Sequence, residues 1–319
     1  MTGRALNHIR LLVEASEDNF EESAYLRANP DVAQAVANGT CPSGRAHFDA
    51  FASTEGRCIR LPIPTDWKQE KLGRIAPLLK DDAGCLATPQ HLDCLTDALR
   101  EEFRVIPTDN VSAHEYDREA LALIERHPTG LILDCGAGLR NTYYRNVVNY
   151  EIVAYDSTDV LGVAERLPFK DDSFDAVMSM NVLEHVKDPF QAALELMRVL
   201  KPGGELMCVA PFLQPLHGYP HHYYNMTAQG LDNLFSPLVE RRISVYGAMQ
   251  PFWALNWFLA RYSAGLSDEL RDRFQRMTVA ELLTDPAIMQ VDPIVMNLAP
   301  ESRTELASAH ALLARKPMP

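Results

Sequence analysis

The sequence predicts an α/β fold in which a doubly wound, mostly parallel sheet carries helical additions before and after it. Continuous apolar runs such as Leu131–Leu133 are followed by an acid and glycines, which is typical of buried parallel strands. Strand-like and helix-like segments then alternate, which favours helices on both faces of the sheet. The chain has 319 residues, 47% of them hydrophobic, enough for a sizeable core with appended parts.

Composition excludes several classes of protein. Acidic residues outnumber basic ones by 43 to 30, for a net charge of −13, which disfavours nucleic-acid binding and docking on anionic lipid. No run of about 18 apolar residues is present, so we expect no stable membrane insertion. We expect no secretory leader, because residues 1–10 are polar, and six cysteines without regular spacing do not indicate a disulfide framework. The default expectation is a reduced, cytoplasmic protein.

The first two parts of the chain read as helical segments. Residues 1–61 form a small helical module, with a turn at Asn29–Asp31 and a helix over 46–52. Residues 62–115 begin with a proline-stiffened linker and continue with a helical segment over 91–103. Cys85 and Cys94 lack the paired spacing of a zinc site, and no metal is expected.

Residues 116–250 carry the predicted core. A helix over 112–126 precedes strands at 131–134, 151–155, near 160, 173–180, 206–210 and 243–246. Asp188 can cap a helix that has Pro189 in its first turn and ends at the Lys201–Gly204 stretch.

The first strand ends in a glycine-rich turn with Asp134, Gly136 and Gly138. Glycines allow a sharp bend and let a ligand approach the backbone. Asn141 stands where a dinucleotide-binding loop has its third small residue, so the pattern suits a ligand without a pyrophosphate. Asp156 follows Asp134 at a spacing close to that of an acid that binds ribose hydroxyls.

Four ordered motifs between about 131 and 226 resemble the class I S-adenosylmethionine-dependent methyltransferases, and most closely a bacterial branch of them. Besides the glycine-rich turn, they are LPFKDDSFD at 167–175, LEHVKDP at 183–189 and RVLKPGG at 198–204. The resemblance implies a seven-stranded Rossmann-like methyltransferase fold, with S-adenosylmethionine as cofactor over the carboxyl ends of the strands.

The resemblance also implies a set of cofactor-binding residues. Asp134, Gly136 and Gly138 would surround the methionine moiety and ribose, and Asp156 would accept both ribose hydroxyls. Ala164 and Glu165 would border the adenine, with Val163 where relatives often carry an aspartate. Asn181 and Leu183 would line the sulfonium side.

Residues 211–226 bring three histidines and three tyrosines into eight positions, just after the fifth predicted strand. Loops at that edge bind ligands in such sheets, and a histidine is the natural base for methyl transfer to a hydroxyl or amine. We expect His217, and after it His221, to act as base, with His222 and Tyr223 as further catalytic candidates. Packing of this loop over the core and a metal site on its three histidines are the alternatives. For Glu184 and His185, a structural role at the start of the next helix is favoured.

Residues 251–319 form a helical C-terminal segment that caps the site or mediates association. The aromatic-rich helix over 251–262 is expected to be a core or homodimer-interface helix, with a lid or a membrane-interface helix as alternatives.

Three functions remain open. A methyltransferase acting on a small molecule or glycan is favoured. Short sequence motifs in the first module resemble segments attached to bacterial polysaccharide-assembly enzymes, and this favours a sugar hydroxyl as the methyl acceptor. The motifs are Tyr25–Leu26, Asn29–Ala33 and Glu55–Arg57. A non-catalytic scaffold that binds the cofactor and a nicotinamide oxidoreductase are the alternatives.

Overall fold

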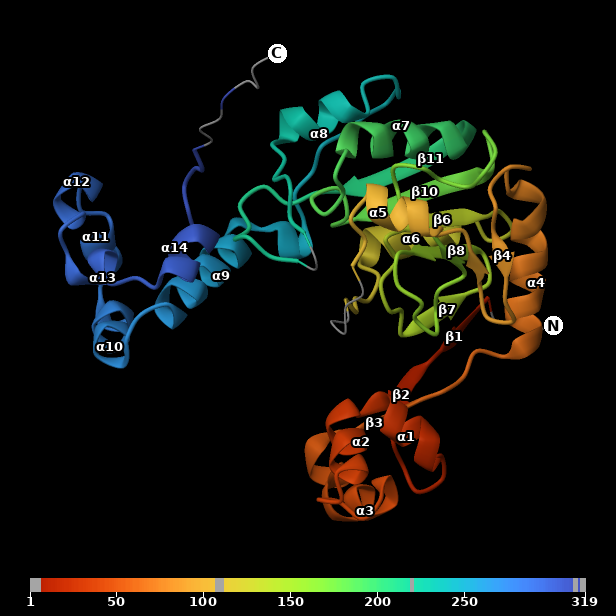
Figure 1. The fold of residues 1–319 in the computed structure, drawn as a ribbon, viewed down its shortest axis with the longest axis horizontal. Helices are drawn as coiled ribbons and strands as arrows, with labels where there is room; N and C mark the ends of the chain where they lie inside the picture. The colour runs from red at the N-terminus through yellow and green to blue at the C-terminus, as the bar shows by residue number, and fades with distance from the viewer. Residues whose placement is uncertain (1–6, 107–111, 219–220, 312–314, 316–319) are drawn as a thin grey trace.

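The computed structural model describes residues 7–106, 112–218, 221–311 and 315. The N-terminal module pairs β2 (Leu12–Glu14) with β3 (Cys58–Arg60) in antiparallel fashion beside three short helices. These helices are α1 (Glu22–Ala28), α2 (Pro30–Ala37) and α3 (Gly44–Glu55). Tyr25, Phe48 and Ile59 form the centre of a separate small core, and the module lies below the main sheet in Figure 1.

The central sheet has seven strands, as predicted. In order across the sheet they are β11 (Leu200–Val209), β10 (Phe174–Met180), β6 (Ile132–Cys135), β8 (Val147–Glu151), β9 (Val160–Leu161), β5 (Leu92–Asp93) and β4 (Leu86–Ala87). Neighbouring strands are parallel except β4 and β5, which form an antiparallel pair. The prediction of a mostly parallel α/β sheet is therefore confirmed.

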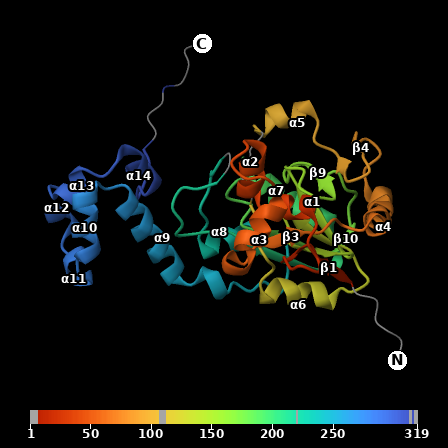
Figure 2. The same cartoon turned by 90° about the horizontal axis from the view of Figure 1, so that it is seen from below.

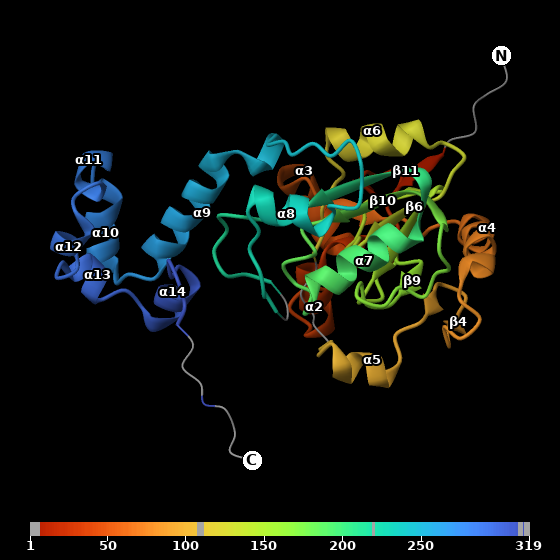
Figure 3. The same cartoon turned by 90° about the horizontal axis from the view of Figure 1, so that it is seen from above.

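Helices cover both faces of the sheet (Figures 2 and 3). Helix α6 (Arg118–Arg126) packs on one face, whereas α4 (Thr65–Ile75), α7 (Pro189–Val199) and α8 (Ala228–Leu234) pack on the other. Successive strand residues point to opposite faces, so Val177 joins the core under α7 and Met178 joins the core under α6. This arrangement leaves the carboxyl ends of the strands free to form a site.

Three predicted elements are wrong. The second strand is β8, four residues earlier than expected, and it follows β6 through β7 (Thr142–Tyr144), which pairs with β1 (His8–Arg10). The helix expected over 91–103 is replaced by β5 and by α5 (Asp97–Glu102). The strand expected at 243–246 does not form; Val245 is exposed there, and a short 3₁₀ turn, η2 (Gly247–Met249), follows. The sheet takes its last two strands from residues 86–93 instead, ahead of the expected core.

The chain after η2 extends away from the sheet (Figure 1). It contains α9 (Pro251–Ala264), α10 (Asp268–Arg276), α11 (Val279–Leu282), α12 (Pro286–Met289), α13 (Pro293–Met296) and α14 (Pro300–Glu305). Phe252 and Trp253 of α9 are 72% and 62% exposed, so the core-helix interpretation of α9 is wrong. None of the helices in the described ranges has the length and apolar character needed to cross a membrane.

Cys85 and Cys94 are joined by a disulfide that links the residue before β4 to the residue after β5. The expectation that all cysteines are reduced is therefore wrong for this pair. Because both sulfurs are bonded to each other, neither is available to a metal.

A buried ion network ties α4 to the sheet. Lys68 and Lys71 place their ammonium groups 2.9 and 3.0 Å from the two carboxylate oxygens of Asp159, and Tyr143 donates to the same carboxylate at 2.6 Å. Burial alone would raise the pKa of Asp159, but the two lysines and the Tyr143 hydrogen bond outweigh it, and the pKa is lowered. The network therefore holds an ionised carboxylate in the interior.

Candidate functional site

The glycine-rich turn after β6 has the geometry that its sequence predicts. Gly136 and Gly138 have φ angles of +79° and +63°, in the left-handed region that favours glycine. A Cβ at Gly136 would lie 2.2 Å from Cγ2 of Val182, and one at Gly138 would lie 2.5 Å from the carbonyl oxygen of Ser112. Both positions therefore exclude larger residues, because Val182 and Ser112 occupy the space beside them.

Glu151, at the end of β8, is the acid beside this turn. Its Oε2 accepts a hydrogen bond of 2.7 Å from the amide of Gly138, and its Oε1 accepts one of 2.8 Å from the amide of Ile152. Burial raises the pKa of Glu151 in spite of these backbone hydrogen bonds. The amide of Val153 also interacts with this carboxylate, so three backbone amides leave part of its four lone-pair sites for a ligand hydroxyl.

Asp156 lies elsewhere. It is five residues past the end of β8, its side chain is 61% exposed, and its carboxylate pairs with the guanidinium of Arg60 at 3.1 Å. Arg60 also donates to the side chain of Asn141 and to the carbonyl oxygen of Arg140. The strand expected over 151–155 ends at Glu151 instead, and the ribose role of Asp156 stays a prediction. Sequence reasoning missed Glu151, although an acid that directly follows the run Val147–Tyr150 was the available signal.

Asp134 is fully buried beneath the turn. Its Oδ2 accepts hydrogen bonds from Arg140 at 2.7 and 3.0 Å and from the hydroxyl of Tyr116 at 2.5 Å. Its Oδ1 is buried without a partner among the described residues. An unpaired buried carboxylate oxygen beside the glycine turn fits an acceptor for the ammonium of a methionine moiety, directly or through water. Arg140 and Tyr116 were not predicted from the sequence.

The two positions expected at the adenine follow β9. Ala164 and Glu165 are buried, and Oε1 of Glu165 accepts hydrogen bonds from the amides of Lys187 and Asp188 at 2.9 and 3.4 Å. Burial raises the pKa of Glu165. Glu165 thus connects the end of β9 to the start of α7.

The two residues expected at the sulfonium follow β10. Asn181 is exposed with a φ angle of +55°, and its amide donates to the carbonyl oxygen of Val209 in β11. Leu183 is fully buried in the main core. Of this pair, only Asn181 presents its side chain to the surface.

Glu184 is fully buried, and both of its carboxylate oxygens lack a hydrogen-bond partner among the described residues. Burial raises the pKa of Glu184 to about 8. Nε2 of His185 lies 3.7 Å from Oε1 of Glu184, and burial lowers the pKa of His185 to about 4. The structural role expected of Glu184 and His185 does not account for these unpaired oxygens.

The histidine-rich loop packs its rings against His185. The ring centroids of His217 and His222 lie 5.1 and 5.7 Å from that of His185. His222 uses both ring nitrogens, accepting from the amide of His217 and contacting the side chain of Asn225. His221 points to the carbonyl oxygen of Arg104 at 3.2 Å. Of the three predicted loop histidines, His217 therefore comes closest to the unpaired carboxylate.

Tyr223 lies at the base of the same loop. Its amide donates to the carbonyl oxygen of Glu184 at 2.6 Å, and its hydroxyl is buried without a partner in the described part of the chain. The hydroxyl is a donor available to a bound molecule or to water.

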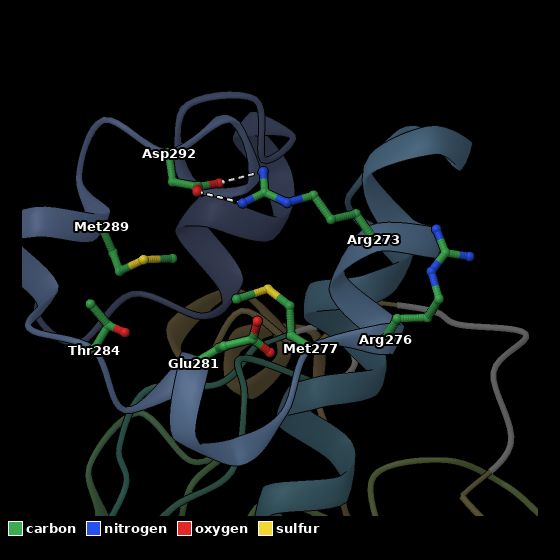
Figure 4. A pocket seen from close by; sticks show the side chains of 7 residues that line it. All are labelled: Arg273, Arg276, Met277, Glu281, Thr284, Met289 and Asp292. Atoms are coloured by element: carbon green, nitrogen blue, oxygen red, sulfur yellow. Dashed lines mark hydrogen bonds and ion pairs between the residues drawn. The ribbon is translucent and has the colours of Figure 1, made fainter.

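A cavity of about 370 Å³ lies among the C-terminal helices (Figure 4), which extend away from the sheet (Figure 1). Its lining residues are Arg273, Arg276, Met277, Glu281, Thr284, Met289 and Asp292. Both oxygens of Asp292 already accept hydrogen bonds from Arg273, at 2.9 and 2.6 Å. The strand ends are therefore the better candidate site.

Comparison with known proteins shows what the middle of the chain is similar to. Residues 133–208 match the family model described as "Methyltransferase domain". An uncharacterized methyltransferase of Schizosaccharomyces pombe is 44% identical over 63 residues, which cover 20% of this chain and 23% of that protein. A demethylmenaquinone methyltransferase of Renibacterium salmoninarum is 38% identical over 86 residues, which cover 27% of this chain and 33% of that protein. The segment over residues 133–208 is therefore similar to methyltransferase domains.

The chain spans only about a quarter to a third of the length of these relatives. Among solved structures, the YcgJ protein of Bacillus subtilis is 19% identical, covers 49% of this chain and 88% of its own, and has a TM-score of 0.33. A phosphoethanolamine N-methyltransferase of Haemonchus contortus is 16% identical, covers 58% of this chain and 48% of its own, and has a TM-score of 0.32. Similarities of this size carry no argument about the acceptor.

Proposed function

We propose that this protein transfers the methyl group of S-adenosylmethionine to a hydroxyl, or an amine, of a small molecule or glycan. The observation that carries the proposal is the order of the strands. β6 lies between β8 and β10, so its glycine turn separates Glu151 at one strand end from the Glu184–His185–His217 cluster at the other. One strand end offers acceptors for a ribose, and the other offers groups that can activate an acceptor.

The cofactor residues in this proposal lie in β6 or at and just after the ends of β6, β8, β9 and β10. They comprise Asp134, Gly136, Gly138, Glu151, Ala164, Glu165, Asn181 and Leu183. Glu151 replaces Asp156 as the acceptor for both ribose hydroxyls. The unpaired Oδ1 of Asp134 is assigned to the methionine moiety. The cofactor supplies an electrophilic methyl group with a good leaving group already attached, so the chain must align the reactants and exclude water.

In this proposal His217 is the base that removes the proton from the acceptor hydroxyl. Nδ1 of His217 lies 2.9 Å from the carbonyl oxygen of Pro215, so Nδ1 carries the hydrogen and Nε2 keeps a lone pair. Burial lowers the pKa of His217, which keeps the ring neutral and able to act as a base. The acceptor oxygen gives its proton to Nε2 and bonds to the methyl carbon. The carbon–sulfur bond breaks with its electron pair on sulfur, which leaves S-adenosylhomocysteine.

Trp257 of α9 supports an enclosed acceptor site. Its ring lies 5.1 Å from that of His217, and Leu216 donates its amide to the carbonyl oxygen of Glu305 in the C-terminal segment. These contacts favour the lid alternative for α9. A sugar hydroxyl is the preferred acceptor because short motifs in residues 1–61 resemble segments attached to polysaccharide-assembly enzymes. Homodimerisation through the exposed face of α9 also remains a proposal.

The test is turnover with S-adenosylmethionine, measured as S-adenosylhomocysteine released in the presence of mono- and oligosaccharides and of small amines. We expect His217→Gln to lower turnover about 100-fold or more while S-adenosylhomocysteine binding stays unchanged. Unchanged turnover would remove the base assignment. Cofactor binding without turnover on any acceptor would favour the scaffold alternative, and NADH binding instead would favour the oxidoreductase.

A further inference from the structure

Three side chains at the end of β10 converge on one point. Glu184, His185 and His217 each offer a ligand atom, and these three atoms all lie within 4.8 Å of one another. Two histidines and one carboxylate form the donor set of catalytic zinc sites that keep an open position. The sequence predicts no metal here, and its metal alternative used His217, His221 and His222 instead of this set.

Glu184 is an independent indication of a cation. The residue is 0% exposed, and neither carboxylate oxygen has a hydrogen-bond partner in the part of the chain that the structure describes. Burying a polar group without a hydrogen-bond partner is unfavourable. Buried charges in proteins are paired or coordinate metals. A bound cation would satisfy both oxygens at once.

Both histidines are oriented as metal ligands are. Nδ1 of His185 lies 2.7 Å from the carbonyl oxygen of His221, and Nδ1 of His217 lies 2.9 Å from that of Pro215. A carbonyl oxygen only accepts, so Nδ1 of each ring carries the hydrogen and Nε2 keeps its lone pair. Metal-bound histidines commonly donate their other ring N–H to a carbonyl in this way, which fixes the tautomer and the ring orientation.

The loop is built to stay close to these rings. Gly218 has a φ angle of +101°, and a Cβ there would lie 2.3 Å from Cε1 of His185. Any larger residue would push the loop off the ring. His222 is not part of the donor set, because both of its ring nitrogens are already engaged.

We propose that Glu184, His185 and His217 bind one divalent transition-metal ion, for which Zn²⁺ is the reference. Its open position takes the acceptor's hydroxyl oxygen. The binding stands on the geometry alone, whereas the ion's part in catalysis rests on the proposed function. In the loaded protein Nε2 of His217 is a ligand and not the base. The ion lowers the pKa of the bound hydroxyl, whose proton leaves to water, and the oxygen then bonds to the methyl carbon as the carbon–sulfur bond breaks.

The test is calorimetric titration of the chelator-treated full chain with ZnCl₂, followed by MnCl₂ and MgCl₂. We expect one Zn²⁺ per chain, bound at micromolar concentration or tighter, and about 100-fold or greater weakening in His185→Ala, His217→Ala and Glu184→Gln. His8→Ala, an exposed histidine in β1, is the matched control and should bind Zn²⁺ as wild type does. Unchanged S-adenosylhomocysteine binding by each variant verifies that it is folded.

Absence of stoichiometric Zn²⁺ binding, or equal binding by wild type and the three variants, would overturn the metal site. If the chelated protein then still methylates, the proposed function survives with His217 as base. If Zn²⁺ binds but S-adenosylhomocysteine does not, the proposed function fails and the metal site stands. Loss of turnover on chelation that is restored by Zn²⁺ would support both.

Discussion

The carboxylate of Asp156 lies 3.1 Å from the guanidinium of Arg60, so this acid holds the N-terminal module against the sheet domain. Arg60 comes from β3 and is 5% exposed. Through the same guanidinium it also reaches Asn141, the residue that breaks the dinucleotide pattern. Asp156 and Asn141 therefore both contact the N-terminal module through Arg60.

Separate substitutions of Glu151 and Asp156 by their amides distinguish the roles of the two acids. Glu151→Gln should weaken S-adenosylhomocysteine binding by about 1.5–3 kcal/mol, or roughly 10- to 150-fold, because hydrogen bonds to a charged acceptor are lost. Asp156→Asn should leave binding near the wild-type value. Isothermal titration calorimetry measures both. The opposite ranking would return the ribose role to Asp156.

Binding of S-adenosylhomocysteine should depend on pH through Glu151. The pKa of this carboxyl is raised above its ordinary value of 4.5 by burial, so it takes up a proton while the pH is still above that value. A protonated carboxyl accepts fewer hydroxyl hydrogen bonds, so affinity should fall as the pH is lowered from 7.5 towards 5. Titrations across this range with wild type and Glu151→Gln provide the measurement. The same slope in both proteins would count against this role for Glu151.

Removal of Arg60 should loosen the N-terminal module. Arg60→Ala leaves the carbonyl oxygen of Arg140 without its buried donor, and we expect a loss of about 1–3 kcal/mol in the free energy of unfolding. Urea denaturation followed by circular dichroism gives the value. Arg10→Ala, an exposed arginine in β1, serves as control and should change little. Equal stability of both variants would mean that the module is held by other contacts.

The buried ion network around Asp159 should contribute more to the free energy of unfolding than Arg60 does, and one substitution tests this. Asp159→Asn leaves Lys68 and Lys71 buried without their counter-ion, which should lower the free energy of unfolding by about 3–5 kcal/mol. Because the folded pKa of Asp159 is lowered below 3.8, its contribution is complete above that pH and is lost as the pH falls further. Denaturation curves at pH 7 and pH 3 test both statements. Asp81→Asn, at a fully exposed ion pair, is the control and should be neutral.

Short sequence patterns correctly predicted features that depend on neighbouring residues alone, namely the glycine turn after β6 and the cap of α7. The apolar run into Gly136 and Gly138, and the Asp188 cap of α7 with its 3.0 Å bond to the amide of Gln191, both appear as expected. Strand β8 was misplaced because Asn149 interrupts its apolar run. Asn149 is buried, and its side chain donates to the carbonyl oxygen of Ser157.

Features that depend on distant segments could not be predicted. The edge strands β5 and β4 reach the sheet from residues 86–93, and no short-range pattern indicates that pairing. The unpaired carboxylate of Glu184 is also a tertiary property, because it arises from what surrounds the side chain. In the sequence, Glu184 and His185 were indistinguishable from residues that anchor a helix.

The most direct test of the central claim is a crystal structure of the protein with S-adenosylhomocysteine. We expect the nucleoside over the turn at Gly136–Gly138, with both ribose hydroxyls on the carboxylate of Glu151 and the sulfur facing the side of Glu184 and His217. A nucleoside bound elsewhere, or an empty site at saturating ligand, would contradict this expectation.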